Sequence, residues 1–406
     1  MEDEPIFELP PPPEPEQPAQ QERLVACPKC AALIDITGCN PLDEVICGGC
    51  RKAFPLLCQF GDYHIERRLG AGGTSVLYLA HNKNLRENLA LKVLSADEMQ
   101  RNPDSAKTFL HEFEMTQNLR HPNIAQIYGG GELDGFYFMA MELVEGVALA
   151  DILAHIQGGE GAKSAPADRG SKEQSVPEMI CLEIVIQAAV ALGVAHENNL
   201  VHGDIKPENI MITYKGVVKV LDFGLVQFAN AEKLVGEGET YSIAGTPMYI
   251  PPERVRGEPE DFRSDLYSLG AALYHLLRGI PPFRAKSVED LVMMHAQAPM
   301  LHFKAVAPWV SDVTCRVVEK SLKKAVVDRY SSHLEFTSDL TLAKNLLMQT
   351  MGKEKQDGRK VLQEFIESLG PKKKQPGMWK RASAAASHTF HSVTSAITKR
   401  VQKKSV

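Results

Sequence analysis

The sequence lacks any apolar run long enough to cross a membrane. A spanning helix needs about 18–20 predominantly apolar residues, whereas the most apolar stretch, residues 180–195, includes Glu183 and Gln187. That stretch therefore predicts a helix buried in a protein core. The opening residues, Met1-Glu2-Asp3-Glu4, are acidic and are followed by prolines, unlike a secretory signal. We expect a cytoplasmic protein with no transmembrane segment.

Acidic residues are missing from residues 371–406, which carry nine lysines and arginines. The rest of the chain carries 36 basic and 51 acidic residues. From Trp379 to Val401, apolar residues recur every three or four positions, which predicts an amphipathic helix. The simplest interpretation is a solvated tail. The alternatives are binding to an anionic membrane surface, to nucleic acid, or to the acidic body of the same chain.

Internal repeats are also lacking, and the composition divides the chain into four parts. Residues 1–23 contain seven prolines and seven acidic residues and are predicted to be disordered. Residues 24–60 form a small cysteine-bearing module, residues 63–347 alternate strand and helix patterns, and residues 348–406 form a charged, then basic tail. Within the third part, residues 158–175 are rich in Gly, Ser, Ala and charge and predict a flexible surface insertion.

Four of the eight cysteines form two closely spaced pairs. Sixteen residues separate Cys27-Pro28-Lys29-Cys30 from Cys47-Gly48-Gly49-Cys50, a spacing typical of a zinc site. Four thiolates complete a tetrahedral shell with no open position, which predicts a structural Zn²⁺. A module this small also needs the metal to fold. It resembles a zinc ribbon. Coincidental cysteines or one redox-active pair remain alternatives. Cys39 or Cys58 could be a substitute ligand, but core packing is the simpler interpretation of both.

A glycine-rich turn follows the module between two predicted strands. It consists of Leu69, Gly70, Ala71, Gly72, Gly73, Thr74, Ser75, Val76 and Leu77. Glycines let backbone N–H groups approach phosphate oxygens closely. No helix pattern follows directly, which argues against a Rossmann fold or a P-loop. Taken alone, the turn equally fits a plain β-hairpin.

The next predicted strand, Leu89-Ala90-Leu91-Lys92-Val93-Leu94, has a single lysine in its middle. A lysine buried in an apolar strand needs an anionic partner. ATP phosphates would serve, as would Glu112, which lies in a predicted amphipathic helix over residues 109–119.

With these two features, seven motifs in order make the chain similar to a protein kinase over residues 63–344. The other five are His202-Gly203-Asp204-Ile205-Lys206-Pro207-Glu208-Asn209, Asp222-Phe223-Gly224, Gly245-Thr246-Pro247-Met248-Tyr249-Ile250-Pro251-Pro252-Glu253, Ser264-Asp265-Leu266-Tyr267-Ser268-Leu269-Gly270 and Asp328-Arg329-Tyr330. The sequence most resembles bacterial serine/threonine kinases of the eukaryotic-like (Hanks) type. The resemblance implies an α+β, two-lobed kinase fold after the zinc ribbon, with a mainly β N-lobe and a mainly α C-lobe. It also implies ATP-dependent phosphorylation of protein Ser or Thr hydroxyls in bacterial signalling.

The resemblance assigns the ATP site. The glycine-rich turn would cover the phosphates, and Lys92, oriented by Glu112, would bind the α- and β-phosphates. The adenine would lie near Ala90, with Met141 at the back and the backbone of Glu142 and Val144 facing its edge.

The resemblance also assigns the chemistry. Asp204 would accept the proton of the substrate hydroxyl, and Lys206 would contact the γ-phosphate. Asn209 and Asp222 would hold Mg²⁺ through oxygen ligands. Three further residues would be architectural, with Glu253 and Arg329 forming a buried pair and Asp265 bracing the catalytic loop.

One departure from the family pattern is Gly203, which replaces an arginine that binds a phosphorylated activation loop in many members. Without that cation a phosphate has less to pair with. We therefore expect activity not to depend strictly on phosphorylation of Thr240 or Ser242, and we expect Thr246 to be structural.

Two alternatives remain open, and only the first follows from this departure. His-Gly-Asp is also similar to small-molecule kinases of the aminoglycoside and choline type, but the Lys206 spacing and the segment ending at Glu253 favour a protein acceptor. A pseudokinase scaffold acting through the ribbon and tail is the other alternative. The full set of Lys92, Glu112, Asp204, Asn209 and Asp222 argues against it.

Overall fold

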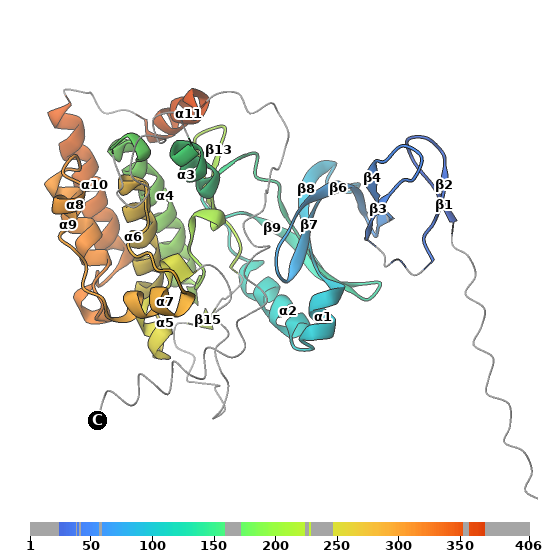
Figure 1. The fold of residues 1–406 in the computed structure, drawn as a ribbon, viewed down its shortest axis with the longest axis horizontal. Coiled ribbons are helices and arrows are strands. Elements are labelled where there is room, and N and C mark those ends of the chain that lie inside the picture. The colour runs from blue at the N-terminus through green and yellow to red at the C-terminus, as the bar shows by residue number, and fades with distance from the viewer. Residues whose placement is uncertain are drawn as a thin grey trace, which may run out of the picture.

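The computed structural model describes residues 24–37, 39, 42–56, 59–158, 172–223, 227–228, 247–351 and 357–369. They form a small N-terminal module, a lobe built mainly from sheet and a lobe built mainly from helices (Figure 1). Several predictions concern residues outside the described ones, namely 1–23, Cys58, 159–171, Gly224, Thr240, Ser242, Gly245, Thr246 and 371–406.

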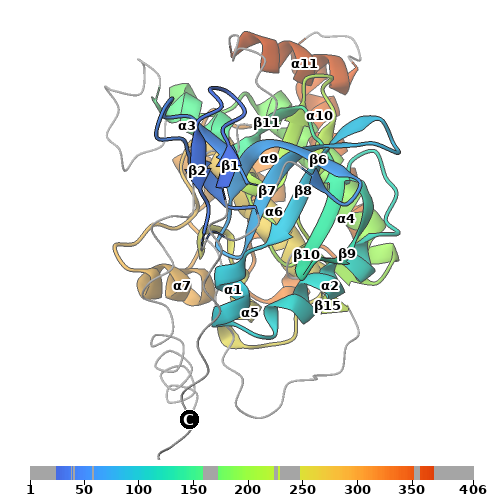
Figure 2. The same ribbon diagram turned by 90° about the vertical axis from the view of Figure 1, so that its right-hand side faces the viewer.

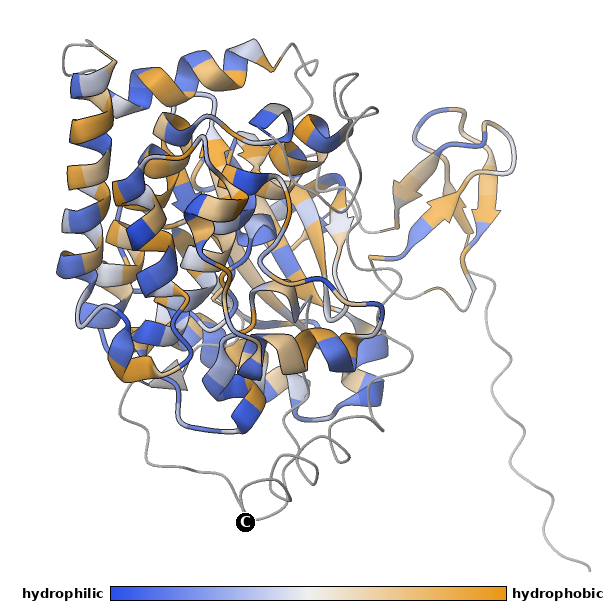
Figure 3. Ribbon diagram, turned by 60° about the vertical axis from the view of Figure 1, so that its left-hand side comes forward, coloured by the Kyte–Doolittle hydropathy of each residue, from blue (hydrophilic) through white to orange (hydrophobic). Residues whose placement is uncertain are grey.

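Two short antiparallel hairpins make up the N-terminal module. Strand β1 (Leu24–Ala26) pairs with β2 (Leu33–Asp35), and β3 (Glu44–Ile46) pairs with β4 (Ala53–Pro55). The strands are largely apolar (Figure 3), although Leu24, Leu33 and Ile46 are exposed. Each hairpin turn carries one Cys-x-x-Cys pair, so the module consists of two similar halves.

The module faces the viewer in Figure 2, in front of the sheet lobe. Leu42 anchors it to the neighbouring sheet. Its side chain is buried with Phe60 and Ile65 in the core of the sheet, and its carbonyl accepts a hydrogen bond of 2.8 Å from the hydroxyl of Tyr78. The module therefore packs on the sheet through an apolar contact and a buried hydrogen bond.

A six-stranded antiparallel sheet forms the first lobe. Its strands, in spatial order, are β5 (Gln59–Phe60), β6 (Tyr63–Ala71), β7 (Ser75–Asn82), β8 (Glu87–Leu94), β10 (Phe136–Glu142) and β9 (Ile127–Leu133). Because successive side chains of a strand point to opposite faces, Leu91 and Val93 pack in the core that contains Leu42, while Ala90 belongs to a cluster on the other face. The module predicted over residues 24–60 includes Gln59 and Phe60. That assignment is corrected, because Phe60 is buried in the core of the sheet.

Helices α1 (Ala96–Arg101) and α2 (Ser105–Thr116) accompany this sheet (Figure 1). Phe109 of α2 is buried with Ile127 and Met139 of the sheet, and Phe113 packs against the same cluster. This packing fixes the face of α2 that carries Glu112.

The second lobe is mainly helical. Its helices are α3 (Leu149–Gly158), α4 (Glu178–Glu197), α5 (Pro252–Arg256), α6 (Phe262–Arg278), α7 (Val288–Gln297), α8 (Phe303–Val306), α9 (Asp312–Ser321), α10 (His333–Thr350) and α11 (Gly358–Ser368). Helices α4 and α6 lie at its centre, where most of their side chains are buried. The predicted α+β architecture, with a sheet lobe and a helical lobe, is confirmed.

Among the described residues, α4 alone has the length and apolar composition of a membrane span, so the statement that no run of the sequence is long enough is corrected. Within its most apolar window, 61% is buried inside the protein. Leu182, Ile184 and Val185 are completely buried in the core of the helical lobe. The prediction of a buried helix over residues 180–195 is confirmed, and packing accounts for its composition.

Short strands between the helices position the loops that carry the candidate residues. Strands β11 (Gly146–Ala148), β13 (Ile210–Thr213) and β14 (Val218–Val220) form one antiparallel sheet, and β12 (Leu200–Val201) pairs with β15 (Gln227–Phe228). Asp204 follows β12, and Asp222 follows β14. Both carboxylates thus stand on loops fixed by paired strands.

The folded body extends beyond the boundary predicted at residue 347. Helix α10 continues to Thr350, and Leu362 and Ile366 of α11 are buried in the core of the helical lobe. The carbonyl of Arg359 lies so close to Gly216 that a Cβ added there would approach it to 1.9 Å. The predicted charged tail therefore begins with a packed helix.

The insertion predicted over residues 158–175 is also shorter than expected at its second end. Residues Lys172–Gln174 form a turn of 3-10 helix, and Gln174 is buried. A Cβ added at Gly279 would lie 2.3 Å from the carbonyl oxygen of Gln174. The end of the predicted insertion thus belongs to the packed body.

Candidate active site

The glycine-rich turn connects β6 and β7 in the sheet lobe. Predicted residues 69–77 all lie in these two strands or in the exposed turn between them. The N–H of Gly72 donates to the carbonyl of Ser75 at 2.8 Å, which closes the turn. A Cβ at Gly73 would meet no protein atom within 4 Å. Packing within the chain therefore does not require glycine there, which leaves room for an anion approaching the backbone.

Apolar side chains gather beside this turn. Leu69, Leu79 and Ala90 are buried together, with Leu77, Met141 and Leu143 packed against them. A second cluster joins Val144 of the segment after β10 to Met211 and Leu221 of the helical lobe. These two clusters offer the apolar surfaces that a planar base needs above and below it.

The side chain of Glu142 is directed toward the helical lobe. Its Oε2 accepts hydrogen bonds from Lys219 Nζ at 2.8 Å and from the N–H of Gln126 at 3.1 Å. Glu142 thus fixes the start of the segment that connects the two lobes, and Val144 lies two residues further along it.

Lys92 links two carboxylates from different parts of the fold. Its Nζ lies 2.9 Å from Oε1 of Glu112 on α2 and 3.1 Å from Oδ1 of Asp222 after β14. The side chain of Lys92 is 11% exposed, so neither contact is a loose surface pair. The predicted Lys92–Glu112 contact is thus present, and Asp222 joins it.

Burial and charge act in opposite directions on this triad. Burial alone would lower the pKa of Lys92, but the charges of Asp222 and Glu112 outweigh it and raise that pKa. Burial alone would raise the pKa of Asp222, yet Lys92 keeps it below its usual value. Burial raises the pKa of Glu112 despite Lys92. Lys92 therefore remains an ammonium ion that faces two carboxyl groups, and Asp222 remains a carboxylate.

The loop after β12 brings the remaining predicted catalytic side chains together. Oδ2 of Asp204 accepts hydrogen bonds from Lys206 Nζ at 2.6 Å and from Asn209 Nδ2 at 3.1 Å. Asn209 Nδ2 also donates to the carbonyl of Asp204 at 2.8 Å. Because its amide nitrogen is engaged, Asn209 presents its amide oxygen. This oxygen and the Asp222 carboxylate are the hard donors that Mg²⁺ prefers.

His202 and Asp265 hold this loop from below. The carboxylate of Asp265 accepts the N–H groups of His202 at 2.8 Å and Gly203 at 2.9 Å. His202 Nε2 donates to the carbonyl of Leu221 at 2.9 Å, and its Nδ1 accepts the N–H of Asp204 at 3.1 Å. The imidazole therefore joins the Asp204 loop to the residue before Asp222, in the tautomer protonated at Nε2.

The pKa values of these supporting groups reflect their burial. Burial raises the pKa of Asp265 to about 7, although the two backbone N–H bonds act to lower it. Burial also lowers the pKa of His202, which keeps the imidazole neutral. The ring of Phe223 packs against that of His202, and the two ring centroids lie 4.4 Å apart.

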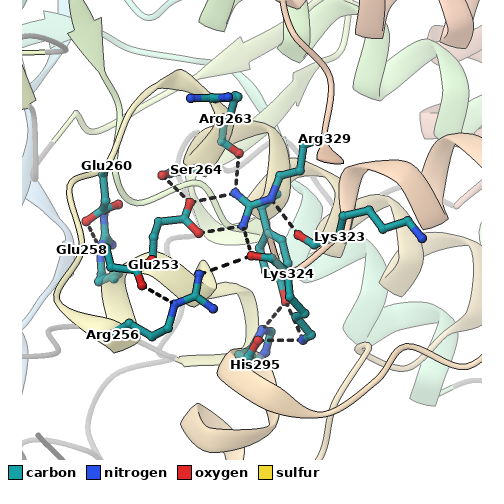
Figure 4. A network of polar contacts seen from close by, with 12 residues as sticks. Glu253, Arg256, Glu258, Glu260, Arg263, Ser264, His295, Lys323, Lys324 and Arg329 are labelled. Carbon is teal, nitrogen blue, oxygen red and sulfur yellow. Dashed lines mark hydrogen bonds and ion pairs between the residues drawn. The ribbon is translucent and has the colours of Figure 1, made fainter. Parts of the chain in front are cut away.

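Glu253 and Arg329 form a buried pair at the base of the helical lobe (Figure 4). The guanidinium contacts both carboxylate oxygens, with Nη1–Oε1 at 2.7 Å and Nη2–Oε2 at 2.6 Å. Arg329 also donates to the carbonyls of Arg263 and Lys323, and Ser264 donates to Glu253. Burial would raise the pKa of Glu253, but Arg329 outweighs it and lowers that pKa. The pair has the geometry of the architectural role predicted for it.

The four predicted zinc ligands converge in the N-terminal module. The sulfur atoms of Cys27, Cys30, Cys47 and Cys50 all lie within 4.8 Å of one another. The Sγ–Sγ distances are 3.7 Å for Cys27–Cys50 and 3.5 Å for Cys30–Cys47. A tetrahedral ion with bonds of about 2.3 Å separates its ligands by roughly 3.8 Å, so the cluster fits one zinc ion.

The two cysteine turns share one backbone geometry. The N–H of Cys27 donates to the carbonyl of Ala32 at 2.9 Å, and that of Cys47 donates to the carbonyl of Lys52 at 3.0 Å. Ala31 and Arg51, each directly after the second cysteine, have φ of 58° and 53°. Cys39 lies outside the sulfur cluster.

A family model described as the protein kinase domain matches residues 63–366. The chain belongs to the protein kinase family. The match ends within α11, in agreement with the packing of that helix on the helical lobe.

The chain has curated relatives that carry serine/threonine kinase names. PknB of Mycobacterium tuberculosis is 34% identical over 287 residues, which cover 70% of this chain and 43% of PknB. PknH of Mycobacterium bovis is 32% identical over 285 residues, covering 70% and 44%. A probable serine/threonine-protein kinase of Clostridium perfringens is 30% identical over 298 residues, covering 73% and 40%. The chain thus spans less than half the length of these relatives.

The fold of the chain also matches solved structures. The crystal structure of the Mycobacterium tuberculosis PknI kinase domain superposes with a TM-score of 0.52 at 28% identity, covering 70% of this chain and 97% of that one. The predicted two-lobed kinase fold is confirmed, and the resemblance to Hanks-type bacterial kinases is confirmed with it.

Several residues that the structure places at this site were not predicted from the sequence. Leu143, Met211 and Leu221 line the apolar clusters, and Arg254 contacts the carbonyl of Gly203. Met211 and Leu221 were within reach of the sequence, because they stand directly beside the Asn209 and Asp222 motifs. Arg254 also stands beside a motif, directly after Glu253, but its partner Gly203 lies 51 residues away, so the contact is formed only in three dimensions.

Proposed function

We propose that the protein is a serine/threonine protein kinase that transfers the γ-phosphoryl group of ATP to hydroxyl groups of protein substrates. The observation that carries this proposal is the assembly of its catalytic side chains. Lys92 bridges Glu112 and Asp222, and Asp204 is held by Lys206 and Asn209. Bacterial signalling is the setting supported by the names of the curated relatives.

The residues of the sheet lobe would hold the nucleotide. The glycine-rich turn offers backbone N–H groups to the phosphates, and the charge of Lys92 stabilises the α- and β-phosphates. Asn209 and Asp222 would hold Mg²⁺, which neutralises phosphate charge when it is bound. The two apolar clusters beside Met141 and Val144 would receive the adenine.

The residues of the catalytic loop would act on the acceptor. Asp204 takes the hydroxyl proton, and its orientation is fixed by the hydrogen bonds from Lys206 and Asn209. Lys206 also supplies a positive charge for the γ-phosphate, at the spacing from Asp204 that Ser/Thr kinases use. The names of the relatives support the same acceptor class.

Transfer of radiolabel from [γ-³²P]ATP and Mg²⁺ tests this proposal. Purified protein should label itself, casein or myelin basic protein, and acid hydrolysis should yield phosphoserine or phosphothreonine. Asp204→Asn and Lys92→Ala should abolish the label. Label on an aminoglycoside or choline but on no protein would favour a small-molecule kinase, and absence of any transfer would favour a scaffold.

We further propose that the four clustered cysteines hold a structural Zn²⁺ and that the module serves to position the kinase or bind a partner. The matching sulfur distances and the repeated turn geometry support the metal. A reducing cytoplasm suits free thiolate ligands. For the basic residues 371–406, which lie outside the described residues, an anionic membrane surface or another acidic partner fits their charge.

A further inference from the structure

The peptide groups on either side of Gly203 are held from two directions. The N–H of Gly203 donates to Oδ1 of Asp265 at 2.9 Å, and its carbonyl accepts a hydrogen bond from Nη1 of Arg254 at 2.5 Å. Gly203 has φ of 75°, in the left-handed region. Its carbonyl belongs to the peptide bond that leads into Asp204, so Arg254 holds the backbone immediately before the proposed base.

Arg254 is itself fixed by a second residue. Its Nε and Nη2 each lie 2.7 Å from one carboxylate oxygen of Glu260. The side chain of Arg254 is 17% exposed and that of Glu260 only 6%. A two-pronged contact of this kind fixes the plane of the guanidinium. The third prong, Nη1, is thereby aimed at the carbonyl of Gly203.

The charge of Arg254 also reaches the catalytic loop. Burial would lower the pKa of Arg254, but Glu260, with smaller contributions from Asp265 and Asp204, raises it. The carboxylates of Asp204 and Asp265 therefore lie in the field of this guanidinium. In family members with arginine at the position of Gly203, that arginine pairs with a phosphorylated activation loop. In this chain Arg254 already places a cation beside the catalytic loop, and that cation is paired with Glu260.

We propose that Arg254 is a positioning residue for the catalytic loop, and that the Arg254–Glu260 pair fixes the peptide before Asp204 without a phosphate on the activation segment. The proposal rests on the proposed kinase function. It predicts that Arg254 acts on phosphoryl transfer and not on ATP binding, because its contact is to the Asp204 side of the site.

Arg256 provides a matched control on the same short helix. Its Nε pairs with Oε1 of Glu258 at 2.9 Å, and Nη2 donates to the carbonyl of Lys324 at 3.3 Å. Glu258 is 49% exposed, and these contacts do not involve the catalytic loop. Arg254→Gln and Arg256→Gln therefore remove the same charge from α5, but only the first removes the tie to Gly203.

Steady-state kinetics and hydrogen exchange, measured on the full chain after phosphatase treatment, test the proposal. Wild type should stay active without phosphate. Arg254→Gln should lower kcat by about tenfold or more, because small misplacements of a catalytic group cost rates of this order, with KM for ATP changed less than about twofold. The backbone amides of residues 202–206 should exchange faster in Arg254→Gln than in wild type. In Arg256→Gln their exchange rates should equal those of wild type.

Three results would overturn the proposal. The first is a kcat of Arg254→Gln equal to that of wild type, and the second is an equal loss of kcat in Arg254→Gln and Arg256→Gln. The third is a wild-type protein that becomes inactive when phosphatase removes its phosphate. Should Arg254→Gln not fold, Arg254→Lys carries the test. A single ammonium cannot hold both oxygens of Glu260 and the Gly203 carbonyl together, so its kcat must fall with ATP affinity retained. If the proposed function is wrong, wild type will transfer no phosphate. The hydrogen-exchange rates of residues 202–206 would still test the contact between Arg254 and Gly203.

Discussion

At the scale of the residue, Glu253 and Arg329 illustrate how a charged pair can be built into a core. Both side chains are almost completely buried, at 1% and 0% exposed. Two parallel hydrogen bonds join them, and the remaining guanidinium donors find backbone carbonyls (Figure 4). Each charge is compensated by the other. Removing either residue would therefore leave the charge of its partner buried and unpaired.

Replacing Glu253 by Gln should therefore lower the free energy of unfolding by about 3–5 kcal/mol, since the charge of Arg329 is left buried and unpaired. Urea denaturation followed by circular dichroism measures the change. Glu258→Gln is the control, because the side chain of Glu258 is 49% exposed and water can solvate the group that replaces it. Its substitution should change stability by no more than about 1 kcal/mol. Similar losses in the two variants would contradict the account.

At the scale of the element, α11 shows a close approach that depends on glycine. Gly216 has φ of 71°, and its missing Cβ is what allows the carbonyl of Arg359 to lie against the turn between β13 and β14. Gly135 has a comparable φ of 78° but has nothing within 4 Å of an added Cβ. Substitutions at these two glycines therefore distinguish the effect of a left-handed backbone, which both share, from the effect of a close contact, which only Gly216 has.

Gly216→Ala should displace α11 and destabilise the protein by about 1–3 kcal/mol more than Gly135→Ala, because only the first variant forces two elements apart. Hydrogen exchange of residues 358–368 should rise in Gly216→Ala alone. Equal destabilisation by the two variants, with α11 equally protected, would show that the helix does not depend on this contact.

The N-terminal module is the element whose stability should depend on metal. We expect one zinc ion per chain by mass spectrometry of the metal content. Cys47→Ser should abolish it and expose the amides of residues 24–56, because a unit of this size has too little core of its own.

Cys39→Ser is the matched control, since Cys39 belongs to the same module but not to the sulfur cluster. It should retain the metal. Absence of zinc from wild type, or retention of zinc by Cys47→Ser, would refute the assignment.

Local spacing in the sequence was enough to predict the elements that carry motifs. A few neighbouring residues are enough to identify each of these elements, namely the two cysteine turns, the Lys92 strand and the loops of Asp204 and Asp222. Helix α11 was missed because its two buried residues, Leu362 and Ile366, stand among charged neighbours that resemble a solvated tail. Its burial depends on a surface of α4 that is distant in sequence. Arg254 and Leu42 were missed for the same reason.

At the scale of the whole molecule, the site exists only where the two lobes meet. Lys92 and Glu112 belong to the sheet lobe, whereas Asp222 and Asp204 belong to the helical lobe. The 3.1 Å contact between Lys92 and Asp222 joins the two. Sequence could name these residues by resemblance, but it could not show that their side chains converge. The arrangement places a cation for the nucleotide and a carboxylate for the acceptor in one assembled site.

The most direct test separates nucleotide binding from phosphoryl transfer in one variant. Asp204→Asn keeps the shape of the side chain but cannot take the hydroxyl proton. It should retain Mg²⁺-dependent ATP binding, measured by calorimetry, while single-turnover transfer to myelin basic protein falls by about 10²–10⁴-fold. Transfer by Asp204→Asn at the wild-type rate, or failure of the wild-type protein to bind ATP, would contradict the account.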